Sequence, residues 1–152
     1  MFRGDFALNL DAKGRLAVPA RYRSLIGEKG GGALVVTVSL TDRCLSVYPF
    51  AEWRRIEEEI QQLPTFDRQA QAIRHLLIGR ACEVEMDSHG RILVPPQLRE
   101  WAGLDKRVQM VGQVMKFELW DEAAWRKRID ELHGPAGELM SEPSEALRAL
   151  VL

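Results

Sequence analysis

The feature that most constrains this chain is an internal repeat. Residues 11–27 align with residues 87–103 at an offset of 76 positions, and seven of the seventeen aligned residues are identical. Both copies read Asp-x-x-Gly-Arg-x-x-Val-Pro, with an Arg four residues after the Pro and a Gly four residues after that Arg. A match of this length within one chain predicts that the fold contains two copies of one supersecondary unit.

The similarity extends beyond this motif at a slightly different offset. It resumes 72 positions apart, so the first half holds four extra residues, which fall in the stretch GEKGGG at 27–32. That stretch lacks the glycine and lysine spacing of a phosphate-binding loop, so it is interpreted as a connection. The matching apolar positions are Leu45, Val47, Tyr48 and Trp53 in the first half and Phe117, Leu119, Trp120 and Trp125 in the second.

Each copy is expected to begin with a β-hairpin. Apolar and polar residues alternate on both sides of the turns at 11–14 and 87–90, which predicts strand, tight turn and strand. Gly14 and Gly90 supply the backbone freedom that such turns need. In the first copy, Pro19 ends the second strand and opens a short helix.

The rest of the chain indicates more strands and helices. Phe66, Ala70, Ile73 and Leu77 have helical spacing and predict a linking helix between the halves. The fold class is therefore α+β: a tandem repeat of two β units forming a small barrel-like core, with flanking helices. Further strands are expected at 33–40, 44–50, 108–112 and 114–120, and helix faces at Trp53, Ile56 and Ile60 and at Trp125, Ile129 and Leu132.

These patterns divide the chain into four segments. The first repeat is expected at 1–63, the linking helix at 64–80, the second repeat at 81–134 and a tail helix at 135–152. The tail is weakly amphipathic, and its apolar side chains are expected to need a neighbouring subunit. These apolar residues are Leu147, Leu150 and Val151.

Composition indicates a globular chain that stays in the cytoplasm. Of its 152 residues, 46% are apolar and 28% charged, as in ordinary folded domains. The sequence shows neither an apolar run of membrane-spanning length nor a basic segment leading into an apolar one, so no membrane partner is expected. Cys44 and Cys82 are not clustered with each other or with histidines, so buried free thiols are expected rather than a metal site.

The sequence does not indicate catalysis. His75 and His133 have no metal-ligand partner at helical spacing, and no serine lies in a Gly-x-Ser-x-Gly context. We therefore expect no enzyme activity, no cofactor and no small-molecule substrate.

The charge distribution favours a nucleic-acid partner at one end of the chain. The net charge is −1, yet residues 1–26 hold five basic and two acidic side chains. A local positive field can attract DNA even when the whole chain is near neutral. The basic side chains of this segment are Arg3, Lys13, Arg15, Arg21 and Arg23.

The duplicated Asp and Arg allow two interpretations. Asp11 and Asp87 are suited to accept backbone N–H bonds at a turn entry. Arg15 and Arg91 could simply pair with these aspartates, but an exposed ion pair stabilises a fold by only about 0–1 kcal/mol. A two-stranded ribbon with a basic tip instead fits the DNA major groove, where arginine makes bidentate contacts.

Three stretches are distinctive: MFRG at the start, NLDAKGRLAVPARYR at 9–23 and MDSHGRILVPPQLRE at 86–100. With these stretches the chain resembles the MraZ family of bacterial transcriptional regulators, and the resemblance extends over essentially the whole chain. It implies a double copy of the swapped-hairpin fold of AbrB-type regulators. It assigns DNA binding to Arg15 and Arg91, with Asp11 and Asp87 as their motif partners.

The resemblance also implies partners and a biological role. The chain is expected to form a ring-shaped homo-oligomer that is cytoplasmic and associated with the nucleoid. This ring would bind direct repeats in the promoter of the cell-division and cell-wall gene cluster, as a repressor. The second motif departs from the first, because His89 stands where the first copy has Lys13, and histidine is mostly neutral above pH ~6.5.

One alternative of a different class stays open. An antitoxin-like module could use the same fold to hold a partner protein against its acidic C-terminal half. Residues 116–145 support this alternative, since they hold four basic and eight acidic side chains. The duplicated basic hairpin favours DNA binding instead.

Overall fold

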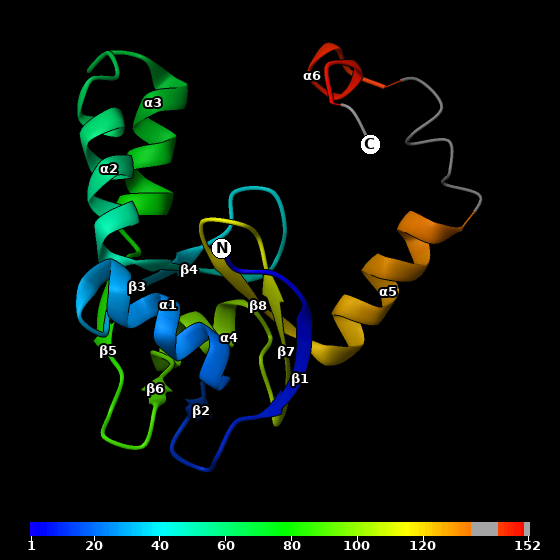
Figure 1. Ribbon diagram of the computed structural model, residues 1–152. Coiled ribbons are helices and arrows are strands. Elements are labelled where there is room, and N and C mark those ends of the chain that lie inside the picture. The colour runs from blue at the N-terminus through cyan, green and yellow to red at the C-terminus, as the bar shows by residue number, and fades with distance from the viewer. Residues whose placement is uncertain (135–142, 151–152) are drawn as a thin grey trace. The chain divides into compact units, whose positions relative to one another are not determined.

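The computed structural model describes residues 1–134 and 143–150, which form two compact units. The first unit, Met1–Asp121, contains the duplicated motif, and the second is Glu122–Leu152. Figure 1 shows the elements of both. The strands of the first unit are β1 (Asp5–Asn9), β2 (Arg15–Ala17), β3 (Ala33–Val38), β4 (Leu45–Pro49), β5 (Cys82–Glu85), β6 (Arg91–Leu93), β7 (Arg107–Gly112) and β8 (Phe117–Asp121). Its helices are α1 (Ala20–Gly30), α2 (Phe50–Gln61), α3 (Arg68–Ile73), the π-helix η1 (Arg74–Ile78) and α4 (Pro96–Trp101).

The strands form one large antiparallel sheet and one small ribbon. The sheet has six strands in the order β1-β7-β8-β4-β3-β5, and β2 pairs only with β6. The α+β class and the two repeats are thereby confirmed. The sheet is open rather than closed into a barrel, because β1 and β5 form its two edges.

Strand pairing corrects the simple hairpin expected from the sequence. The turn at 11–14 forms, but the strands on its two sides belong to different sheets: β1 pairs with β7 and β2 pairs with β6. The alternation of apolar residues predicted the strands correctly. It carried no information about partners, because β2 finds its partner in the other repeat.

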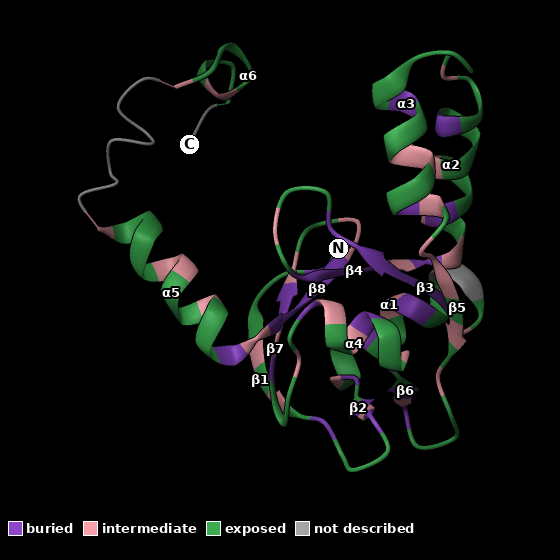
Figure 2. Ribbon diagram, turned by 180° about the vertical axis from the view of Figure 1, so that it is seen from behind, coloured by how far each residue is buried: buried purple, intermediate pink, exposed green. Residues whose placement is uncertain are grey.

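The main core lies on one face of the sheet. It joins sheet residues such as Leu34 and Val36 to the inner side of the ribbon and to α1 and α4. Leu16 and Ile92 of the ribbon, and Tyr22 and Ile26 of α1, are completely buried there. Figure 2 shows buried stretches in purple on the sheet strands and on α1, and the exposed loops in green.

A helical hairpin packs against part of the opposite face of the sheet. Successive residues of a strand point to opposite faces, so Val35 turns away from the main core and packs with Trp53, Ile60 and Leu77. The hairpin consists of α2, α3 and η1 and projects from the sheet (Figure 1). It confirms the helix predicted around Trp53.

The linking helix begins later than predicted. Asp67 caps α3 by accepting hydrogen bonds from the amides of Gln69 and Ala70, so the helix starts at Arg68. Phe66 therefore lies outside the helix and is 98% exposed. Its helical spacing from Ala70 was coincidental.

The second unit contains α5 (Glu122–His133) and α6 (Glu145–Arg148). Helix α5 confirms the helix predicted around Trp125. Ser144 caps α6 by accepting a hydrogen bond from the amide of Leu147. Residues 135–142 and 151–152 of the predicted tail helix, Val151 included, lie outside the described residues. Within the described part of the chain, helices are too short or too polar to cross a bilayer.

Candidate nucleic-acid interface

The first motif forms a turn built around the carboxylate of Asp11. Its Oδ1 accepts hydrogen bonds from the amides of Lys13 and Arg15, both at 2.9 Å. Its Oδ2 accepts one from Arg15 Nε at 2.7 Å. Gly14 donates its amide to the carbonyl of Asp11 and has φ +83°, a conformation that other residues rarely adopt.

The second motif repeats this geometry. Asp87 Oδ1 accepts hydrogen bonds from the amides of His89 at 2.8 Å and Arg91 at 2.9 Å. Its Oδ2 accepts one from Arg91 Nε at 2.9 Å. Gly90 again has positive φ, +73°. Both aspartates and both glycines therefore occupy equivalent positions in the two turns.

These hydrogen bonds stabilise the charged form of both aspartates. The backbone N–H of Arg15 is the main reason that the pKa of Asp11 falls to about 2 from its ordinary value of 3.8. The backbone N–H of Arg91 likewise lowers the pKa of Asp87. Both aspartates are ionised at neutral pH, where each orients the guanidinium of its arginine.

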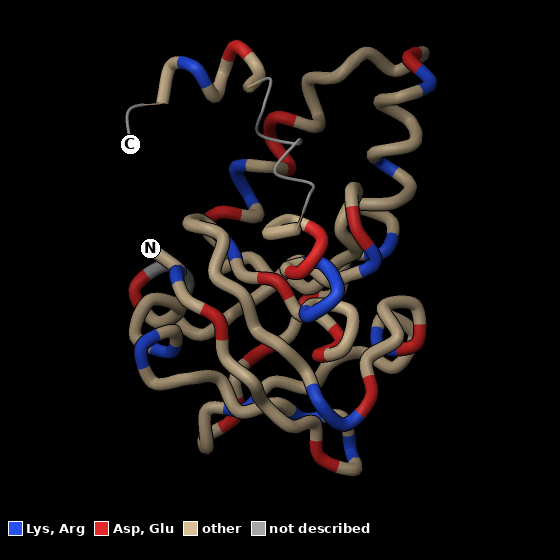
Figure 3. Tube along the Cα trace, turned by 90° about the vertical axis from the view of Figure 1, so that its right-hand side faces the viewer, with Lys and Arg blue, Asp and Glu red and all other residues tan. Residues whose placement is uncertain are grey.

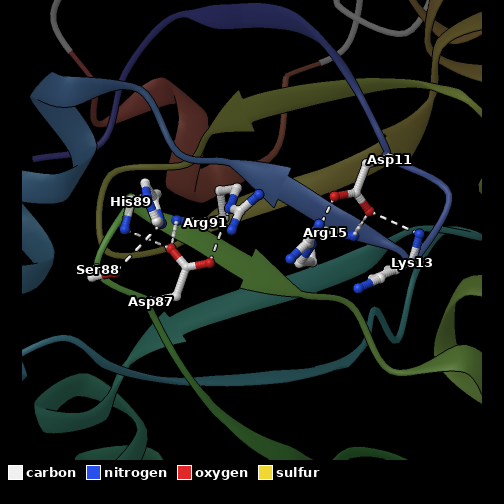
Figure 4. Close-up of polar contacts among 7 residues, drawn as sticks. All are labelled: Asp11, Lys13, Arg15, Asp87, Ser88, His89 and Arg91. Atoms are coloured by element: carbon white, nitrogen blue, oxygen red, sulfur yellow. Dashed lines mark hydrogen bonds and ion pairs between the residues drawn. The ribbon is translucent and has the colours of Figure 1, made fainter.

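Both motif arginines project from the outward face of the β2–β6 ribbon. Leu16 lies opposite Ile92 in the register, and both point into the core. The neighbouring positions on each strand point the other way, so Arg15 and Arg91 share the solvent side. Their side chains have nearly equal exposure, 32% and 30%. Figure 4 shows them between the two aspartates, on adjacent strands.

The guanidinium groups keep donors for a ligand. Each aspartate engages the Nε atom of its arginine. The terminal Nη atoms of Arg15 and Arg91 have no hydrogen-bond partner in the described part of the chain. A fixed guanidinium with two outward amino groups is suited to bidentate contact with guanine or phosphate.

The tips of the two loops differ. Lys13 is exposed in the first loop, and His89 is exposed at the equivalent position of the second. His89 Nδ1 lies 3.4 Å from the hydroxyl of Ser88. The loops lie at the same end of the first unit in both ribbon views (Figures 1 and 2). The first loop therefore carries a lysine cation at its tip where the second carries a histidine.

Arg23 and its repeat equivalent Arg99 lie against the loops. A Cβ at Gly90 would lie 2.5 Å from Arg23 Cδ. A Cβ at Gly14 would lie 2.5 Å from Arg99 Cζ. Arg23 was expected from the sequence to belong to the basic surface. Arg99 was missed, although it occupies the position of Arg23 in the second repeat, and the repeat itself was the signal that could have found it.

The two other predicted arginines lie together elsewhere in the unit. Arg3 and Arg21 are exposed and line one shallow pocket with Met1, Ser24 and Leu25. The buried hydroxyl of Tyr22 holds the two segments together by donating to the carbonyl of Arg3 at 2.8 Å. Basic and acidic residues are otherwise interspersed along the chain, as Figure 3 shows.

The cysteines are not arranged for chemistry. Cys44 is free and buried, and burial raises the pKa of its thiol to about 12, so it is not a nucleophile at neutral pH. Cys82 is free and half-buried. The described residues contain no group of three or more His, Cys, Asp or Glu side chains placed to hold a metal ion.

Comparison with known proteins identifies the family. A family model described as "MraZ protein, putative antitoxin-like" matches twice, at residues 1–76 and 77–142. A protein named transcriptional regulator MraZ from Thioalkalivibrio sulfidiphilus is 53% identical over 152 residues, the full length of both chains. Proteins of the same name from Pseudomonas savastanoi pv. phaseolicola and Shewanella oneidensis are 52% and 50% identical, each over 86% of both chains. With both motifs in place and both halves matched, this chain belongs to the MraZ family.

Proposed function

We propose that this protein is a sequence-specific DNA-binding transcriptional regulator. The DNA-contacting surface is the outward face of the β2–β6 ribbon together with its two loops. The relatives are named transcriptional regulators, and DNA is the partner that a basic antiparallel ribbon fits.

The observation that carries the proposal is the shared orientation of Arg15 and Arg91. They project from one face of one ribbon, and each is held by an aspartate through Nε. A purely structural ion pair would not need two copies on the same outward face. A pair of oriented guanidinium groups on a ribbon can enter the major groove and contact base edges.

The remaining basic residues contribute contacts to the DNA backbone. Lys13 is the exposed cation at the tip of the first loop. Arg23 lies beside the second loop, and Arg3 and Arg21 form a separate exposed pair. Phosphate contacts of this kind set affinity and orientation but do not read sequence.

One chain carries too few cations on this surface to bind DNA tightly, which argues for an oligomer. A ring of identical subunits presents many ribbons at once, and linked sites gain on the order of 10²–10⁴ in affinity over single ones. Repeated subunits then match direct repeats in DNA, spaced near one helical turn of ~10 bp. In this account the target is the promoter of the cell-division and cell-wall gene cluster, and binding represses it.

A gel-shift titration tests the function. The labelled probe is the DNA upstream of the protein's own gene, and a shuffled sequence of the same composition is the control. We expect a shift of the promoter at protein concentrations that leave the shuffled DNA free, with affinity falling steeply as salt rises. Equal affinity for both DNAs would reject sequence-specific regulation.

A second candidate function is that of an antitoxin-like protein, the term in the description of the matching family model. In that reading the chain holds a partner protein rather than DNA. A protein that fails to shift the promoter at any salt concentration but co-purifies in a fixed ratio with one partner protein would favour it.

A further inference from the structure

We infer that Arg23 and Arg99 are positioning residues that act crosswise. Each holds the motif loop of the other repeat, which couples each loop to the opposite half of the chain. The coupling is a property of the fold, while its consequence for DNA affinity rests on the proposed function.

Arg99 holds the first loop from the second repeat. It lies on α4, and its guanidinium covers the Cα of Gly14: a Cβ there would lie 2.5 Å from Cζ and 2.6 Å from Nη1. A backbone hydrogen bond joins the same two repeats, since the amide of Val94 donates to the carbonyl of Gly14 at 2.9 Å. The Gly14 peptide is thus fixed by two residues of the other repeat.

Arg23 makes the reciprocal contact. It lies on α1, and a Cβ at Gly90 would lie 2.5 Å from its Cδ and 2.7 Å from its Nη1. The amide of Val18 donates to the carbonyl of Gly90, again at 2.9 Å. Two independent contacts, one from a side chain and one from the backbone, therefore cross in each direction.

Two separate features favour glycine at this position of each loop. Positive φ is the first, and the second is the arginine side chain over its Cα, which would have to shift to make room for a Cβ. Gly103 has the first feature alone, because it has φ +64° and nothing lies within 4 Å of the place where its Cβ would be. This difference supplies a matched control.

The chemistry of arginine suits this role. Its planar, weakly hydrated guanidinium can lie flat on a peptide, which a compact and strongly hydrated ammonium cannot do equally well. Arg99 Nε is buried and has no hydrogen-bond partner in the described part of the chain, so the group is held there by packing. Lysine at this position should therefore restore the loop only in part.

Hydrogen exchange of the full-length protein tests the crossing. In Arg99→Ala we expect the amides of Lys13 and Arg15, which donate to Asp11, to exchange on the order of tenfold faster, while those of His89 and Arg91 stay near wild type. Arg23→Ala should give the opposite pattern. Arg99→Lys should lie between wild type and Arg99→Ala. Faster exchange in the loop of the same repeat, or equal acceleration of both loops, would overturn the inference.

A double-mutant cycle gives a second measurement that does not depend on DNA. The loss of stability caused by Gly14→Ala should be smaller in an Arg99→Ala background, because the steric conflict with the guanidinium is gone. The loss caused by Gly103→Ala should be the same in both backgrounds. Denaturant midpoints measure both. Strict additivity for Gly14→Ala would overturn the inference.

Promoter affinity then separates the inference from the proposed function. Arg99→Ala should weaken promoter binding, because the first loop is no longer held in place. Arg99→Lys should restore binding in part. If each arginine variant speeds hydrogen exchange only in the loop of the other repeat while promoter affinity stays unchanged, the positioning role is upheld and the ribbon is rejected as the DNA surface. Unchanged exchange in both loops would reject the positioning role, whatever happens to DNA affinity.

Discussion

At the scale of single residues, the side chain that organises each motif is the aspartate. The carboxylate of Asp11 accepts three hydrogen bonds, two from backbone amides and one from the guanidinium of Arg15. The ion pair is about two-thirds covered and adds little stability by itself. Its effect is to fix the direction of the arginine, and Asp87 does the same for Arg91.

The lowered pKa of Asp11 predicts a pH dependence of stability. Its pKa is about 2 in the folded protein and near 3.8 without the turn, so the contribution is complete above pH ~4 and is lost as pH falls from ~4 to ~2. Asp11→Asn should therefore lower the melting temperature most at neutral pH, and the gap to wild type should narrow on acidification. Thermal melts between pH 7 and pH 2.5 measure this. A gap that stays constant would show that the ionised carboxylate does not stabilise the turn.

At the scale of elements, the ribbon joins the repeats. Strand β2 belongs to the first repeat and β6 to the second, so the outward face exists only when both are folded together. The buried pair Leu16 and Ile92 fixes the register that turns both arginines outward. A slip by one residue would reverse these faces.

The difference between the loop tips predicts unequal electrostatic roles. Lys13→Ala should lower the slope of log affinity against log salt by about one unit for each phosphate contact that is lost. His89→Ala should leave the slope nearly unchanged at pH 7.5, because histidine does not carry the fixed charge that lysine carries at Lys13. Promoter affinity at four or more salt concentrations measures both slopes. An equal loss of slope in both variants would mean that the two tips contact DNA alike.

The sequence predicted the local features of this ribbon but not its pairing. The repeat revealed the turns, the Asp and Arg pairs and most strands, because these depend on residues close together in the chain. The pairing of β2 with β6 depends on contacts between the halves, and short strands of three residues carry no signal of register. Arg99 was overlooked for a related reason: its contact with Gly14 joins residues of different repeats.

At the scale of the whole molecule, the proposal requires more than one subunit. The net charge of −1 gives a single chain no general attraction to DNA, so affinity must come from several ribbons acting together. In the described part of the tail, the apolar side chain of Leu150 is 56% exposed, so it offers apolar surface for contact with another subunit.

Light scattering at micromolar concentration tests this assembly. We expect a mass several times that of one chain, with a narrow distribution, because a ring closes at a fixed number of subunits. The mass should not change between low and moderate salt. A monomer under these conditions would contradict both the ring and the multivalent account of DNA binding.

The central claim is that Arg15 and Arg91 contact DNA, and a comparison of three variants tests it most directly. Arg15→Ala, Arg91→Ala and Arg55→Ala each remove one positive charge, but Arg55 lies on α2 and pairs with Glu52 and Glu59. The measurement is affinity for the upstream DNA at one salt concentration, after circular dichroism and light scattering show an unchanged fold and assembly. We expect the two motif variants to lose about 1–3 kcal/mol per contacted site and the Arg55→Ala protein to bind within about twofold of wild type. Wild-type affinity in Arg15→Ala and Arg91→Ala, or an equal loss in Arg55→Ala, would contradict the account.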